Sequence, residues 1–158
     1  MYNVTWYAAE MFAAWVGARL PQEAEWEYAG RAREKTRYCN GDTEDDLKKV
    51  AWYAGNAKGH PWPVGQKAAN AFKLHDMHGN VWEWCLDAWD PEAYAQRAAG
   101  VLVEPKSASS AVVGQSAAEN PANLADPVAG RVVRGGSWNN NAVRCRAAYR
   151  NLRNPWNA

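Results

Sequence analysis

The stretch that decides the fold of this chain is residues 74–84, which read Leu-His-Asp-Met-His-Gly-Asn-Val-Trp-Glu-Trp. The pair Gly79-Asn80 tolerates positive φ, so it predicts a tight reversal of the chain. The residues that follow, 81–84, predict a strand whose side chains alternate between two faces. The alternation places Trp82 and Trp84 on one face. The opposite face would carry Val81, Glu83 and Cys85.

Two carboxylates flank the predicted turn, Asp76 before it and Glu83 after it. A carboxylate beside a valine on a strand face loses hydration and needs a partner. One explanation is that both acids bind a cation together with carbonyl groups freed at the turn, as calcium sites do. The other is that Glu83 accepts backbone N–H groups while Asp76 caps the turn. The residues by themselves leave both explanations open.

Composition limits the class of protein. A chain of 158 residues with a net charge of +1 predicts a single domain, 1–158, without a field that attracts nucleic acid or anionic membrane. It contains ten tryptophans and seven tyrosines but two phenylalanines, which suits an irregular core or a binding face. No apolar run is long enough for a membrane span and no signal peptide is evident, so we expect no membrane insertion and a cytoplasmic location by default. The three cysteines, an odd number without CxxC spacing, argue against a zinc site and a fully paired disulfide framework.

Two helices are predicted before residue 33. The first covers residues 5–16, with Thr5 as its N-cap and Gly17 at its end, and the second covers about 23–32, with Pro21 near its first turn. The second carries three acids in its first half. They could be mistaken for catalytic carboxylates, but the helix dipole favours acids there, so we expect a solvated helix start. These acids are Glu23, Glu25 and Glu27.

The middle of the chain has no sustained period. Residues 51–56 predict a short strand or a buried loop, and His60 is expected at the surface. His75 and His78 bracket the turn, but no third ligand accompanies them, so structural hydrogen bonds are favoured over a transition metal. Residues 91–130 predict a long loop with a helical turn at 91–99.

The last segment, residues 131–158, holds six arginines and six asparagines but no acid. Residues 131–134 predict a strand that ends at two glycines. Further on, a second strand would place Cys145 and Ala147 on one face and Arg144, Arg146 and Ala148 on the other. Arginine with aromatic rings would also suit an RNA-binding arm. The nearly balanced charge of the chain makes nucleic acid an unfavoured partner, since surface arginines often pair with acids elsewhere in a fold.

Three blocks of sequence together resemble the formylglycine-generating-enzyme, or sulfatase-modifying-factor, domain family. The first is Arg-Leu-Pro-Gln-Glu-Ala-Glu-Trp-Glu-Tyr-Ala at 19–29, the second covers residues 70–84, and the third is Arg-Val-Val-Arg-Gly-Gly-Ser-Trp-Asn-Asn-Asn at 131–141. The resemblance implies an α+β fold of the C-type-lectin-like class. Such a fold has two helices, short twisted antiparallel strands and much irregular loop.

The resemblance also implies a structural calcium ion at the central block. Its ligands would be the side chains of Asp76 and Glu83 and the carbonyl groups of Gly79 and Val81. This agrees with the cation explanation for the two carboxylates, and we therefore favour calcium there.

The family divides by function. Its oxidases hold Cu(I) between two cysteines after the third block, and here only Cys145 stands at a matching place, whereas Asn140 stands at the other. Because a single thiol cannot supply a linear cuprous site, we expect no copper and no oxidase activity. A copper-dependent oxidase with Cys145 as its catalytic thiol, acting on sulfatase-type cysteines, is the alternative. The family's iron-dependent sulfoxide synthases need a histidine-bearing helical domain that this sequence does not contain.

A third branch comprises the variable proteins of diversity-generating retroelements, which this tail resembles closely. That resemblance implies a ligand-binding surface, most simply for a protein, built from adaptable asparagine, arginine and aromatic contacts. The asparagines could instead satisfy loop backbone, and both roles stay open. The expected surface comprises Trp138, Asn139, Asn140, Asn141, Val143, Arg144, Arg146, Tyr149, Asn151, Arg153 and Trp156.

Two family features are not matched at the ends of the sequence. The family usually has a strand before the first helix and a Gly-Phe-Arg strand after the Asn-Pro at 154–155. Their absence would leave a sheet edge exposed, so we expect this edge to be open to self-association.

Overall fold

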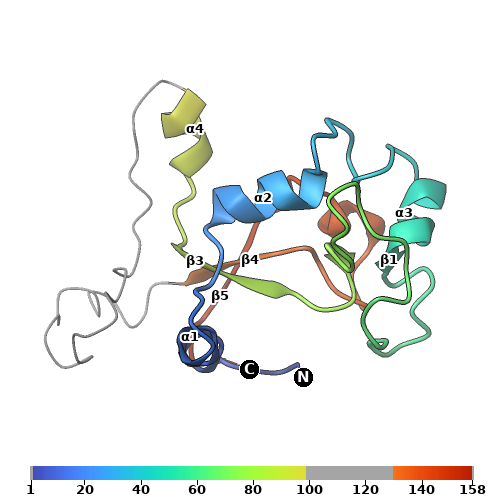
Figure 1. The fold of residues 1–158 in the computed structure, drawn as a ribbon. Coiled ribbons are helices and arrows are strands. Elements are labelled where there is room, and N and C mark those ends of the chain that lie inside the picture. The colour runs from blue at the N-terminus through green and yellow to red at the C-terminus, as the bar shows by residue number, and fades with distance from the viewer. Residues whose placement is uncertain (1, 99–129, 158) are drawn as a thin grey trace, which may run out of the picture.

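The structure is a computed structural model that describes residues 2–98 and 130–157 (Figure 1). It is an α+β fold in which short helices surround two small sheets. The helices are α1 (Trp6–Trp15), α2 (Glu23–Arg31), α3 (Glu44–Val50), α4 (Ala93–Ala98) and a 3-10 helix (Ala142–Cys145). The strands are β1 (Ala51–Trp52), β2 (His78–Gly79), β3 (Glu83–Ala88), β4 (Arg131–Arg134) and β5 (Asn151–Arg153).

The larger sheet is antiparallel and has the strand order β3-β4-β5. Trp84 pairs with Val133, and Val132 pairs with Leu152. The smaller sheet is a parallel pair, β1 with β2, in which Ala51 lies opposite His78. Figure 1 shows α2 lying along the larger sheet and α1 at its lower end, with both chain termini nearby.

The helix boundaries follow from local chemistry. Thr5 caps α1 by accepting a hydrogen bond from the Ala8 N–H, and α2 begins with a capping box formed by Gln22 and Glu25. The end of α2 is marked by Ala32 in the left-handed region, with φ of 48°. Both predicted helices are therefore confirmed.

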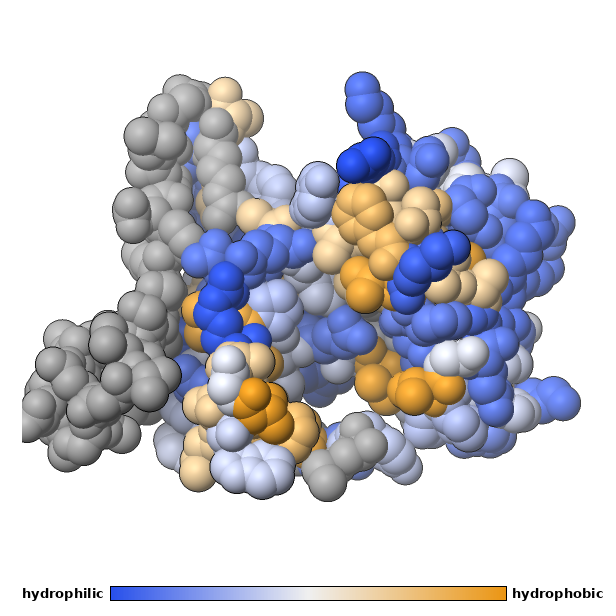
Figure 2. Space-filling view, in the orientation of Figure 1, coloured by the Kyte–Doolittle hydropathy of each residue, from blue (hydrophilic) through white to orange (hydrophobic). Residues whose placement is uncertain are grey.

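Helix α1 buries little of its apolar surface. Only Trp6 and Ala13 are buried, while Met11, Phe12 and Trp15 are exposed. Figure 2 shows hydrophobic side chains gathered over this helix at the lower part of the molecule. Trp6 is fixed by its indole N–H, which donates to the Cys85 carbonyl over 2.8 Å.

Two apolar clusters form the core. One contains Trp26 of α2 with Cys85 of β3 and Val132 of β4. The other contains Leu47 of α3 with Tyr53 and Cys145. The turn at 76–80 lies between them, since Met77 belongs to the first cluster and the His78 ring contacts Tyr38 of the second.

Several sequence-based expectations need correction. The strand predicted around Cys145 is wrong, because Asn141 caps a 3-10 helix there and β5 starts only at residue 151. The central strand begins at Glu83, two residues later than predicted. Helix α3 was not predicted, and the helical turn expected at 91–99 is α4, whereas the rest of the predicted long loop lies outside the described residues.

The expectation of a solvated acidic helix start is also wrong. Glu23 is buried and Glu27 is half-buried, so only Glu25 remains at the surface, where it pairs with Arg19. Glu23 accepts hydrogen bonds from both Arg134 and Arg150. Glu23 and Glu27 belong to an ion-pair network that ties α2 to the C-terminal segment.

Within the described residues, no helix combines the length and apolar character needed to cross a membrane.

Candidate functional site

The turn predicted at Gly79-Asn80 is present, and three of its residues have positive φ: Asp76 at 58°, Gly79 at 74° and Asn80 at 57°. Glycine is needed at position 79, because a Cβ there would lie 2.1 Å from the Trp52 carbonyl oxygen. The Asn80 side chain exchanges two hydrogen bonds of 3.0 Å with the backbone of Trp62. The turn is therefore held by close backbone packing on one side and by an amide pair on the other.

One of the two carboxylates at this turn is incompletely satisfied within the described residues. Asp76 accepts the Gly65 N–H at its Oδ2 over 2.7 Å, but its buried Oδ1 has no hydrogen-bond partner there. Glu83 accepts the Trp26 indole N–H over 2.6 Å. Burial raises the pKa of the Glu83 carboxyl to about 7, and the charge of Asp76 adds to the rise, while the Trp26 bond opposes it. The backbone-capping explanation therefore holds for one oxygen of Asp76, whereas Glu83 bonds to a side chain.

The chemistry of this donor set fits a hard cation. Carboxylate oxygens with a buried orphan atom, next to a turn with carbonyl groups, are the ligands that calcium takes. Among the described residues, no three or more histidine, cysteine, aspartate or glutamate side chains are grouped to hold a metal. Any cation here would therefore depend on backbone carbonyl groups in addition to Asp76 and Glu83.

His78 has a structural role, as predicted. Its Nε2 accepts the Cys39 N–H over 3.0 Å and its Nδ1 lies 2.7 Å from the Cys145 carbonyl oxygen. Because a carbonyl only accepts, Nδ1 carries the proton of a neutral ring. Burial lowers the pKa of His78 to about 4, so the ring stays neutral at pH 7. His60 is exposed, as expected.

The thiol at the position that resembles a copper ligand is deeply buried. Burial raises the pKa of Cys145 to about 12, although the nearby backbone N–H groups of Ser137 and Gly79 oppose the rise. Asn140, at the other position, accepts the Ser137 N–H at its Oδ1 over 3.0 Å. Cys39 lies in the same apolar cluster as Cys145, and all three cysteines are free.

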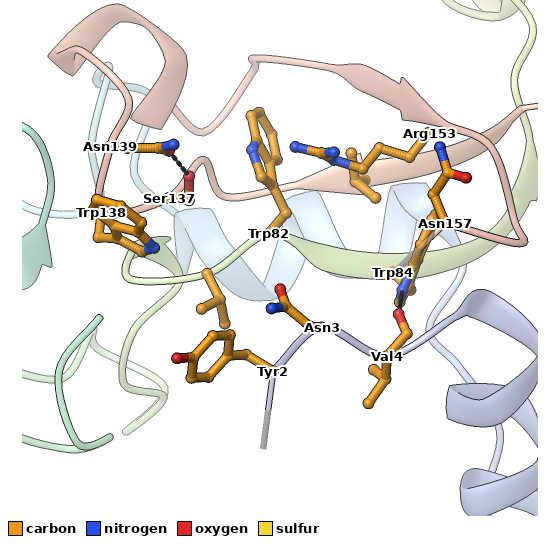
Figure 3. A pocket seen from close by; sticks show the side chains of 12 residues that line it. Tyr2, Asn3, Val4, Trp82, Trp84, Ser137, Trp138, Asn139, Arg153 and Asn157 are labelled. Atoms are coloured by element: carbon orange, nitrogen blue, oxygen red, sulfur yellow. Dashed lines mark hydrogen bonds between the residues drawn. The ribbon is translucent and has the colours of Figure 1, made fainter. Parts of the chain in front are cut away.

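A groove of about 290 Å³ lies beside the larger sheet, where the N-terminal segment meets the C-terminal one (Figure 3). Figure 3 shows Trp82 between Trp138 on one side and Arg153 on the other, with Tyr2 and Asn3 beneath. Hydrogen bonds fix two of its walls, from the Trp84 indole to the Val4 carbonyl at 3.0 Å and from the Ser137 hydroxyl to Asn139 at 2.6 Å. The lining comprises Tyr2, Asn3, Val4, Val81, Trp82, Trp84, Val133, Ser137, Trp138, Asn139, Arg153 and Asn157.

Sequence reasoning found part of this groove. Trp82 and Trp84 face the same way, as alternation predicted, and they line it together. Val81 also lines the groove, although alternation predicted it on the opposite face with Glu83. The alternation does not apply to Val81, because the regular strand begins only at Glu83. The N-terminal residues were missed, since no local pattern links them to a segment more than 130 residues away.

The predicted surface residues are distributed over several parts of the molecule. Trp138, Asn139 and Arg153 line the groove, and the Tyr149 ring lies 6.2 Å from that of Trp82. The Trp156 ring lies 4.4 Å from that of Tyr7 on α1. The others lie outside the groove. Asn140 and Asn141 bond to loop backbone, and Val143 and Arg144 are exposed on the 3-10 helix. Arg146 lines a second hollow, and Asn151 pairs in β5.

Short helices around two small sheets, joined by much irregular backbone, define the C-type-lectin-like class of α+β fold. Within that class, the chain belongs to the sulfatase-modifying factor enzyme 1-like domain family, which matches residues 1–158.

The chain is similar in sequence to proteins named as kinases and as formylglycine-generating enzymes. The chain is 34% identical over 155 residues to the serine/threonine-protein kinase Pkn1 of Chlamydia trachomatis, covering 97% of this chain and 21% of the kinase. It is 35% identical over 146 residues to the formylglycine-generating enzyme of Mycobacterium tuberculosis, covering 85% of this chain and 44% of the enzyme. The chain therefore spans less than half the length of these curated relatives.

Two solved structures are also similar to this chain. Treponema denticola variable protein 1 matches with a TM-score of 0.61 and 28% identity, over 89% of this chain and 44% of that one. PvdO from Pseudomonas aeruginosa matches with a TM-score of 0.69 and 26% identity, over 98% of this chain and 56% of that one.

Proposed function

We propose that this domain binds a ligand, most simply a protein segment, through the groove beside the larger sheet, and that it does not act as a formylglycine-generating oxidase. The observation that carries the proposal is the composition of the groove. Three tryptophans, a tyrosine and an arginine meet there with three asparagines. Tryptophan, tyrosine and arginine dominate the binding energy of protein interfaces, and asparagine supplies adaptable hydrogen bonds.

The groove is also preorganised. Trp84 is anchored to the N-terminal segment, and Trp82 follows a turn held by Asn80 and Gly79. A rigid wall loses little conformational entropy when a partner binds, which favours affinity. The structural likeness to a solved variable protein supports the same interpretation.

A test of binding starts from peptides selected from a displayed library against the intact protein. We expect their dissociation constants to rise about thirtyfold for Trp138→Ala, the size of a hot-spot loss. Trp15→Ala on α1 is the control, because it removes an exposed tryptophan that does not line the groove. If peptides bind both variants as tightly as they bind the parent protein, the groove is not the peptide-binding site.

The oxidase alternative depends on a second thiol near Cys145. The amide of Asn140 is occupied by Ser137, and the buried Cys145 thiol stays protonated at neutral pH, whereas cuprous ion binds a thiolate pair. Cys39 belongs to the same apolar cluster as Cys145, and the His78 ring bonds to the backbone of both. Titration of the reduced protein with Cu(I) separates the alternatives: we expect no tight one-to-one uptake, and uptake that disappears in both Cys145→Ser and Cys39→Ser would establish a copper site.

We further propose that the central turn holds a structural calcium ion between Asp76 and Glu83, with the carbonyl groups of Gly79 and Val81 as further ligands. The orphan Oδ1 of Asp76 and the raised pKa of Glu83 support this, because a divalent cation would satisfy the first and reverse the second. When bound, calcium would neutralise two carboxylates and hold the turn that positions Trp82. The test is whether calcium raises the melting temperature of the protein but not that of Glu83→Gln or Asp76→Asn.

A further inference from the structure

A second hollow, of about 180 Å³, lies where the loop after α2 meets the C-terminal segment. It shares no lining residue with the groove. Four cationic side chains and one carboxylate line it: Arg31, Lys35, Arg37 and Arg146, with Asp42.

The walls of this basic hollow are held in place by hydrogen bonds. The Ala147 N–H donates to the Arg37 carbonyl over 2.8 Å and so joins the two segments. The Arg31 guanidinium is fixed by Glu27 at 2.8 Å and by the Thr36 carbonyl at 3.1 Å. Charged groups that are already oriented lose less entropy when they bind an ion.

The charge of the hollow is not neutralised from within. Four cations and one carboxylate give a formal charge of 4 − 1 = +3 at the lining, and Glu27 offsets one of these charges through Arg31. In the described part of the chain, none of the side chains of Lys35, Arg37 and Arg146 forms an ion pair. Arg146 donates through Nε to the Val143 carbonyl at 3.0 Å, which leaves both terminal nitrogens for a ligand.

Asp42 gives the hollow a second property. Its Oδ1 accepts the Arg37 N–H over 2.8 Å, which orients the carboxylate, and no partner for Oδ2 occurs among the described residues. A carboxylate oxygen repels a fully ionised anion but accepts a hydrogen bond from an anion that keeps a proton. Arginine forks match the geometry of phosphate oxygens.

We propose that the basic hollow binds a phosphate group that still carries a proton, with orthophosphate as the ligand best suited to neutral pH. Arg37 and Arg146 donate to the ionised oxygens, Lys35 adds charge, and Asp42 accepts the remaining P–O–H proton. Orthophosphate keeps one proton at pH 7.5, whereas sulfate has none and a phosphate monoester loses its last one near pH 6. Orthophosphate therefore binds in preference to sulfate, and a monoester binds as tightly as orthophosphate only below about pH 6.

The first test is calorimetric titration of the intact protein with inorganic phosphate at pH 7.5 and low ionic strength. We expect saturable one-to-one binding that weakens about tenfold in Arg37→Gln and again in Arg146→Gln, because each removes a charge-assisted hydrogen bond. Both side chains reach the surface, so these variants keep their fold. Arg33→Gln is the matched control, since it removes the same charge nearby while its guanidinium lies over the Phe72 ring at 5.7 Å.

The second test uses sulfate, glycerol phosphate and Asp42→Asn. Sulfate and, at pH 7.5, glycerol phosphate bind the parent protein at least tenfold more weakly than orthophosphate does, and Asp42→Asn reduces that difference. Binding of glycerol phosphate equal to that of orthophosphate at pH 7.5 would overturn the role of the proton. Absence of saturable phosphate binding, or equal weakening by Arg33→Gln, would overturn the site itself, while peptide binding in the groove would be unaffected by either result.

Discussion

The six arginines of residues 131–158 divide into two groups with opposite surroundings. Arg131, Arg134 and Arg150 are packed inward: Arg134 pairs with Glu23 at 2.6 Å, Arg150 chelates the same carboxylate, and Arg131 lies 4.1 Å from the Trp6 ring centre. The other three arginines form no ion pair in the described residues and reach the surface. These are Arg144, Arg146 and Arg153.

The difference shows that one residue type performs two functions in one short segment. A buried guanidinium needs partners for its charge and its N–H groups. Arg134 pairs its terminal nitrogens with Glu23, Glu27 and the Ala147 carbonyl, whereas its Nε has no hydrogen-bond partner among the described residues. An exposed guanidinium stays hydrated and remains available for a partner. The first group fixes the scaffold, and the second contributes to both proposed sites, since Arg153 lines the groove and Arg146 the basic hollow.

The largest effect expected from this comparison is on the buried pair. Arg134→Ala leaves Glu23 with a single arginine and Glu27 with fewer donors, so we expect a loss of about 3–5 kcal/mol in the free energy of unfolding. Arg144→Ala, in the exposed group, should change it by no more than about 0.5 kcal/mol. Guanidinium chloride denaturation measures both, and equal losses would erase the distinction between the two groups.

The second prediction extends the comparison to a buried carboxyl that has no arginine, Glu83. Its folded pKa of about 7 lies above the ordinary value of 4.5. Below pH 4.5 the carboxyl is protonated in both states, but as the pH rises toward 7 the unfolded chain releases the proton first. In calcium-free buffer Glu83 therefore removes up to about 3 kcal/mol of stability between pH 4.5 and 7.

His78 acts in the opposite direction over an overlapping range, so the comparison must be made between variants. Because its pKa falls from 6.5 to about 4 on folding, His78 removes stability as the pH drops below 6.5. The difference between the parent protein and Glu83→Gln isolates the carboxyl. Calcium at pH 7 should raise the melting temperature of the parent protein, but not that of Glu83→Gln or Asp76→Asn. An unchanged parent protein in calcium would contradict the proposed ion.

The smallest effect on stability is expected from the exposed surface of the tail. Replacing Arg144, Arg146 and Tyr149 together by alanine removes no ion pair of the described residues, so we expect a change of about 1 kcal/mol or less. Thermal unfolding measures this. Because Arg144 and Arg146 lie outside the groove, a loss of peptide affinity should come only from Tyr149, whose ring lies 6.2 Å from that of Trp82. A large fall in melting temperature would place these side chains with the structural group instead.

Self-association is expected at the edge of the larger sheet, where β5 carries Leu152 in an exposed position. Sedimentation at increasing concentration measures it, and Leu152→Lys should weaken it, since a charge blocks edge pairing. This variant leaves both groups of arginines unchanged. Association that persists in Leu152→Lys would indicate that the exposed face of α1, and not the edge of the sheet, is the contact surface.

Local signals in the sequence gave correct predictions where a few neighbouring residues decide the structure. Thr5 capped a helix, Gly79 and Asn80 took positive φ, and the burial of Cys145 and Ala147 was confirmed although their predicted strand was not. The strand prediction failed because alternation over five residues cannot be told from a capped 3-10 turn, and here Asn141 supplied the cap. Similarly, the helix dipole was a sufficient local explanation for the acids of α2. The sequence therefore gave no sign that Glu23 and Glu27 pair with arginines of the C-terminal segment.

The sequence by itself determined the family, the two principal helices and the turn at residues 76–80. Each of these depends on residues close together in the chain or on recognisable sequence motifs. Only the tertiary structure decided which charges are buried, since Glu23 meets an arginine 111 positions away. It alone also brought Tyr2, Trp82, Trp138 and Arg153 to one groove. The physical reason is that desolvation depends on what packs against a side chain, and that is set by distant segments of the fold.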